Sequence, residues 1–121
     1  MKLATLREGG RDGTLIVVSR DLSRAVRADG LAATLQWALE NWSDVAGALA
    51  ELSAALNDNR AEGSFELDVA ALASPLPRAY QFLDGSAYLA HVERVRRARG
   101  AEMPPSYRSD PLMSQAASDG F

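Results

Sequence analysis

The chain contains no cysteine and a single histidine, His91, among its 121 residues. Without cysteine, disulfide bonds, thiol catalysis and thiolate metal sites are all excluded. No apolar run reaches the roughly 18–20 residues that a transmembrane helix needs, and the opening MKLATLREGG lacks the apolar stretch of a signal peptide. We therefore expect a soluble, cytoplasmic protein with no membrane partner.

Positive charge is also scarce, because 13 Lys and Arg residues stand against 16 Asp and Glu residues, for a net charge of -3. A nucleic-acid-binding domain usually has a basic balance, so we expect no nucleic-acid partner. The sequence has no Gly-x-Ser-x-Gly motif, no Walker-type phosphate loop and no Glu-x-Glu or Asp-x-Asp pair. What it has is 47% hydrophobic and 24% charged residues, the composition of a folded globular chain.

The N-terminal residues predict a β-hairpin. Residues 1–7 alternate as in a short strand, residues 9–13 form a Gly/Asp-rich turn, and residues 14–19 (TLIVVS) are a buried strand. Residues 22–28 are expected to add a third strand, with Leu22 pointing inward.

The period of the apolar residues then changes from two to between three and four, which predicts amphipathic helices. We expect two helices, over about 31–41 and 43–57, that begin after residues 29–30. Asn41 lies at the expected break, because asparagine prefers helix caps to helix interiors. A single bent helix is the alternative.

The aromatic residues of this half are expected to pack in the core. Trp37 and Trp42 lie on or beside the apolar stripe, and large aromatics dominate core burial, so packing is preferred to ligand stacking. Residues 60–74 are a connector, in which Phe65 and Leu67 are the expected anchors.

The stretch PLPRAYQFLDGSAYLAHVERVRRARGAEMPPS carries the candidate functional residues. Asp84 precedes a helix-favouring run and is expected to cap a helix over about 85–99 that stops at Gly100. At about 100° per residue, seven residues return Asp84 and His91 to one helix face, with Tyr88 between them. Roughly 10 Å apart, they could flank one ligand, Asp84 as an oxygen ligand for Mg²⁺ or Ca²⁺ and His91 as a base.

From spacing alone, a structural interpretation of this pair is preferred. Asp84 would be a helix cap, His91 a packed side chain, and the arginines at the end of the helix would complement its dipole. Mg²⁺ takes about six oxygen ligands and usually more than one carboxylate. The residues by themselves therefore supply half a site.

Longer runs of sequence resemble a known family. The run AYQFLDGSAYLAHVERVRRARGAEMPPS, followed by DPLMSQAASDGF, resembles the fumarylacetoacetate hydrolase family, specifically its bacterial two-domain members. The opening MKLATLREGGRDGTLIVVSRDLSRAV and the segment LQWALENWSDVAGALAELSAALN resemble its N-terminal domain. The resemblance implies an α+β fold: residues 1–74 would be a small domain with a short sheet and two helices. Residues 75–121 would be the first, helix-bearing segment of a truncated mixed β-roll catalytic domain.

The same resemblance implies a metal-dependent hydrolase that cleaves a C–C bond in a β-diketo acid, such as fumarylacetoacetate or an acylpyruvate. The first metal carboxylate of the family precedes its catalytic histidine by seven residues, as Asp84 precedes His91. Mg²⁺ or Ca²⁺ is the expected cofactor, and Tyr88 and Arg99 are expected to bind the substrate. The remaining metal ligands are expected beyond Phe121, so we expect this chain alone to be inactive and the whole protein to be a homodimer.

Two other functions remain open. A related isomerase, decarboxylase or hydratase, acting on 2-hydroxy-dienoate or 2-oxo acids, would share the metal carboxylates. A free-standing, non-catalytic interaction domain would require Phe121 to be the true end of the protein.

Overall fold

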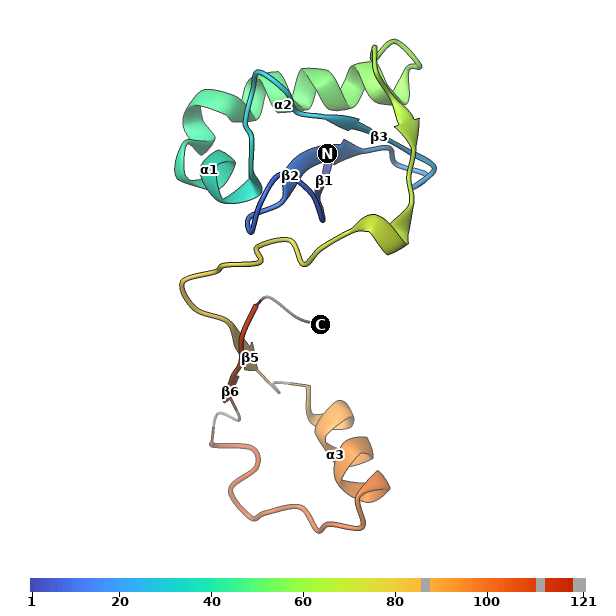
Figure 1. Cartoon of the computed structure of the whole chain (residues 1–121). Helices are drawn as coiled ribbons and strands as arrows, with labels where there is room; N and C mark the ends of the chain where they lie inside the picture. The colour runs from blue at the N-terminus through green and yellow to red at the C-terminus, as the bar shows by residue number, and fades with distance from the viewer. Residues whose placement is uncertain (86–87, 111–112, 119–121) are drawn as a thin grey trace. The chain divides into compact units, whose positions relative to one another are not determined.

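The computed structural model describes residues 1–85, 88–110 and 113–118 of the chain. These residues form two compact units, one made of residues 1–79 with Ser118 and the other lying within residues 80–117. In the described residues, the first unit holds a four-stranded sheet and two α-helices, and the second holds a two-stranded sheet and one α-helix (Figure 1). The α+β class is thereby confirmed. The boundary between residues 74 and 75 stays a prediction.

The sheet of the first unit is antiparallel, in the order β1-β2-β3-β4. Its strands are β1 (Lys2–Leu6), β2 (Thr14–Val18), β3 (Arg24–Arg27) and β4 (Phe65–Glu66). Lys2 pairs with Val18 and Leu6 with Thr14, so the predicted hairpin is confirmed. Strand β4 was not expected, because a two-residue strand in a connector leaves no periodic pattern in the sequence.

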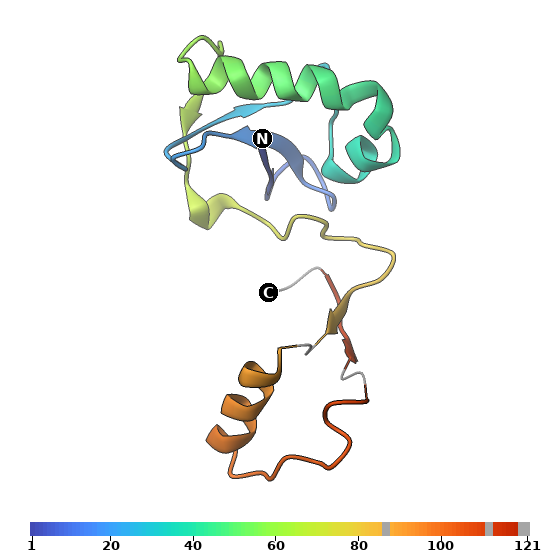
Figure 2. The ribbon, with the colours of Figure 1, turned by 180° about the vertical axis from the view of Figure 1, so that it is seen from behind.

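Both faces of the sheet are covered, and β2 is buried on both. Helices α1 (Leu35–Glu40) and α2 (Trp42–Asn57) cover one face, and the chain after β4 crosses the other (Figures 1 and 2). On β2, Leu15 and Val17 belong to the core beneath the helices, whereas Ile16 and Val18 belong to the second core. Burial on both faces explains why this strand is continuously apolar.

The connector closes the second core. Phe65, Leu67 and Leu72 pack against its buried residues, which confirms the two predicted anchors. A single 3₁₀ turn, η1 (Val69–Ala71), is capped by the Asp68 carboxylate, which accepts a hydrogen bond from the Ala70 N–H at 2.9 Å.

The two predicted helices are confirmed, but the first begins later than expected. The Thr34 hydroxyl caps α1 by accepting the Trp37 N–H at 3.2 Å. The predicted entry at residues 29–30 is wrong, because Gly30 has a φ of +78° and the chain turns there before the helix starts. Asn41 separates the helices with φ -118° and ψ 33°. In the part of the chain that the structure describes, no helix is long and apolar enough to span a membrane.

Three predictions of side-chain burial are wrong. Trp37 and Trp42 are 45% and 40% exposed, because neither belongs to the buried face of its helix, which Leu35 and Ala38 form on α1 and Val45, Leu49, Ser53 and Leu56 form on α2. Leu22 is 55% exposed with a φ of +63°, since β3 begins two residues later and Leu22 lies in the turn before it.

Candidate functional site

The second unit contains all four candidate site residues, and its sheet positions the first. Strand β5 (Leu83–Gly85) pairs antiparallel with β6 (Met113–Gln115), and Asp84 lies opposite Ser114. The Ala116 N–H donates to the Phe82 carbonyl at 3.1 Å and continues the ladder by one bond. Asp84 is therefore the central residue of a three-residue strand, and it is exposed.

The helix of this unit positions His91 and Arg99. Tyr88 is the N-cap of helix α3 (Leu89–Ala98), and its carbonyl accepts the N–H groups of His91 at 2.9 Å and Val92 at 3.1 Å. Val92 is its buried residue, whereas His91 is exposed. The helix ends where Gly100 takes a φ of +66°, which confirms the predicted stop.

The predicted helix cap at Asp84 is wrong. Its φ and ψ place Tyr88 in the extended region, so the helix starts after it, and Asp84 belongs to a strand. The physical reason is the pairing of residues 83–85 with residues 113–115, a contact between segments far apart in the sequence. Residues 86 and 87, which the prediction also placed in the helix, lie outside the described residues. The shared helix face of Asp84 and His91 does not exist.

Asp84 and His91 instead lie on two different elements of the second unit: Asp84 on a strand and His91 in the first turn of a helix. Both residues are exposed, and Tyr88, which lies between them in the chain, is 82% exposed. Across the described ranges 1–85, 88–110 and 113–118, no three Asp, Glu or His side chains gather to hold a metal ion. Asp84 offers a hard cation one oxygen ligand, which does not hold Mg²⁺ or Ca²⁺ by itself.

Arg99 lies at the opposite end of α3 from His91. Its N–H donates to the carbonyls of Val95 and Arg96, both at 3.1 Å, as the C-cap of the helix. Eight residues of helix correspond to about 12 Å of rise between the two backbones, so the long Arg99 side chain would have to reach back toward His91 for both groups to contact one small ligand.

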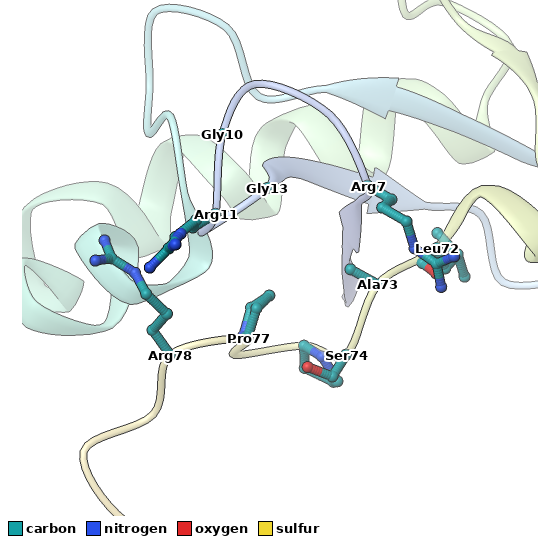
Figure 3. Close-up of a pocket in the computed structure, with 10 residues that line it drawn as sticks. Arg7, Gly10, Arg11, Gly13, Leu72, Ala73, Ser74, Pro77 and Arg78 are labelled. Carbon is teal, nitrogen blue, oxygen red and sulfur yellow. The ribbon is translucent and has the colours of Figure 1, made fainter. Parts of the chain in front are cut away.

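The first unit has a feature that the sequence analysis missed, a hollow of about 780 Å³ that we call the arginine hollow. Three guanidinium groups line it, those of Arg7, Arg11 and Arg78 (Figure 3). The turn between β1 and β2 and the linker over residues 72–78 form its walls. In the sequence, Arg7 and Arg11 lie close to the glycine-rich turn, which is a weak signal for an anion site. The third arginine, Arg78, comes from a distant segment, so the sequence does not show that the three lie together. Neither Asp84 nor His91 is among the residues that line the hollow.

The fold defines an α+β protein that starts with a small antiparallel domain and continues into a second unit with an exposed carboxylate and imidazole. Residues 1–78 match the model of the family described as fumarylacetoacetase N-terminal domain 2, and the chain belongs to this family. The search of curated proteins found no match. The matched residues end before Asp84, so the match covers the N-terminal part of the chain, which belongs to the first unit.

Proposed function

We propose that this protein serves the metal-dependent hydrolysis of a C–C bond in a β-diketo acid of the fumarylacetoacetate or acylpyruvate type. The observation that carries the proposal is the family match over residues 1–78. The second unit adds support, because Asp84 and His91 keep the seven-residue spacing of a metal carboxylate and a catalytic histidine, and both are exposed to solvent. Asp84 lies on strand β5 and His91 on helix α3, and a strand and a helix can present two groups to one ligand.

Each candidate residue has a separate role in this proposal. Asp84 supplies one oxygen ligand to Mg²⁺ or Ca²⁺, an ion that polarises a carbonyl group when it is bound. His91 accepts a proton from the attacking water, because an imidazole can act as a general base near neutral pH. Tyr88 and Arg99 contact the substrate, and the Arg99 guanidinium can bind a carboxylate through two N–H groups.

The test is acylpyruvate hydrolysis by the protein as its gene encodes it. His91→Ala should lower kcat by about 10²- to 10⁴-fold, the usual contribution of a general base. Asp84→Asn should raise the Mg²⁺ concentration needed for half-maximal activity. Asp110→Asn, which alters another exposed aspartate of the same unit, is the matched control and should change neither quantity. Full activity of His91→Ala would refute the assigned base, and full activity in a metal chelator would refute the metal-dependent reaction.

The 121-residue chain alone should show no hydrolysis and at most weak Mg²⁺ binding, because a Mg²⁺ site usually needs more than one carboxylate. Acylpyruvate cleavage by this chain, lost in His91→Ala, would contradict that expectation. Product analysis identifies the reaction: a hydrolase releases pyruvate and a carboxylic acid in equal amounts, whereas an isomerase leaves the number of product molecules unchanged.

A further inference from the structure

We propose that the arginine hollow of the first unit binds a small molecule that carries two oxyanion groups, such as a dicarboxylate. Its lining includes neither Asp84 nor His91, and the proposal does not rest on the proposed hydrolysis. A volume of about 780 Å³ lies within the range of small-molecule sites in proteins. All of the lining residues belong to the first unit, so the site does not depend on how the two units are arranged.

The charges at the hollow are not balanced. The Asp12 carboxylate binds Arg78, with Nε 2.7 Å from Oδ1 and Nη2 bonded to Oδ2. This hydrogen bond holds the pKa of Asp12 below its usual value, so Asp12 is ionised at neutral pH. The Arg7 Nη2 donates to the neutral Leu72 carbonyl at 3.1 Å. Arg11 forms no hydrogen bond or ion pair with any described residue.

In the part of the chain that the structure describes, neither Arg7 nor Arg11 forms an ion pair with a carboxylate, so two positive charges line the hollow beside the Arg78–Asp12 pair, in a chain whose net charge is -3. The other ion pairs of the described residues are one to one, Arg27 with Glu8 at 2.6 Å and Arg60 with Asp58 at 2.8 Å. A ligand with two negative charges would neutralise the excess.

The positive groups lie at two ends of the hollow. Arg11 is the neighbour of Asp12, which holds Arg78, so these two arginines lie at one end. Arg7 lies at the other end, beside Leu72, and the linker runs between them (Figure 3). This separation favours one oxyanion group at each end over a single compact anion. Guanidinium forks match carboxylate and phosphate oxygens, which sets the chemical class of the ligand.

The walls are fixed before any ligand binds. Strand β1 holds the linker through the Ala73 N–H, which donates to the Thr5 carbonyl at 2.9 Å, and through the Thr5 hydroxyl, which donates to the Pro75 carbonyl at 2.7 Å. The buried Ser118 holds the next part, because its hydroxyl accepts the Ala79 N–H at 2.9 Å. A preformed wall lowers the ordering cost of binding.

The experiment is a ¹⁵N NMR titration of the 121-residue chain at constant ionic strength with three probes: adipate, inorganic phosphate and acetate. We expect saturable shifts for adipate at the amides of Gly10, Gly13 and Ala73, with a dissociation constant in the millimolar range. Inorganic phosphate should bind more weakly, and acetate weakest of all, because each can occupy only one end. Arg11→Gln should weaken adipate binding by about tenfold, the effect of one lost charge-assisted contact.

Arg20→Gln is the matched control. It removes the same charge from an exposed residue of the same unit, but Arg20 follows β2 at the end of the hairpin opposite to the glycine turn. Equal weakening by both variants would overturn the proposal, because the attraction would then be diffuse. An absence of saturable shifts at the hollow would also overturn it. Phosphate binding as tight as adipate binding would refute the two-ended ligand.

Discussion

Replacing Gly13 by alanine should destabilise the first unit much more than the same change at Gly63. The two glycines have nearly equal left-handed backbones, with φ of +66° and +69°. Alanine in this region costs roughly 1–2 kcal/mol, partly offset by the lower entropy of the unfolded chain. A Cβ at Gly63 meets no described atom within 4 Å, but at Gly13 it would lie 2.3 Å from Thr5 Cγ2 and 2.4 Å from the Leu6 carbonyl oxygen.

Neither neighbour of Gly13 can move aside easily. Thr5 is fully buried, and its hydroxyl donates to the Pro75 carbonyl, so rotating the side chain breaks this hydrogen bond. Leu6 is paired with Thr14 in the β-ladder, which fixes its carbonyl. Overpacking of this kind costs roughly 1–3 kcal/mol beyond the backbone term. We therefore expect a loss of about 2–4 kcal/mol for Gly13→Ala and about 1 kcal/mol for Gly63→Ala.

Urea unfolding, followed by far-UV circular dichroism and tryptophan fluorescence, measures this difference. Both tryptophans, Trp37 and Trp42, lie in the first unit, so their fluorescence reports on the unit that contains the two glycines. Losses that agree within about 0.5 kcal/mol, the usual size of a surface effect, would refute the steric argument.

Two further predictions concern the same unit. Leu49→Ala should cost about 2–5 kcal/mol of unfolding free energy, because Leu49 is a fully buried residue of α2. Leu39→Ala, at a 48% exposed leucine, should cost less than about 1 kcal/mol, and equal losses in urea unfolding would contradict the assigned core. Hydrogen bonds from the Ser19 hydroxyl and from the Ser23 N–H and hydroxyl lower the pKa of Asp21 from 3.8 to about 2. The ionised Asp21 therefore stabilises the folded state above pH 3.8, and this contribution is lost as the pH falls toward 2. Urea unfolding measured at several pH values in this range should show a smaller fall in unfolding free energy for Asp21→Asn than for the unchanged protein.

The sequence by itself determined the elements that local patterns specify. The hairpin follows from a β-branched run beside a turn rich in glycine. The two helices follow from the apolar period, and their separation follows from Asn41. The end of α3 follows from Gly100, because glycine adopts a φ of +66° without the steric penalty that other residues have. In each case the deciding interactions lie within a few residues of one another.

The tertiary structure decided what depends on distant pairing. Residues 83–85 form a strand because residues 113–115 pair with them. Asp84 therefore lies in a sheet and not in the helix that the sequence predicts. The exposure of Trp37 and Trp42 depends on how much of each helix the sheet covers, and the spacing of apolar residues in the sequence does not predict that.

The arginine hollow shows the same limit. Arg78 reaches Asp12 across 66 positions of the chain, and no local pattern predicts that contact. A sequence records which residues are present and how they repeat, but the contacts that bring Arg7, Arg11 and Arg78 to one hollow form only when the linker folds back along β1.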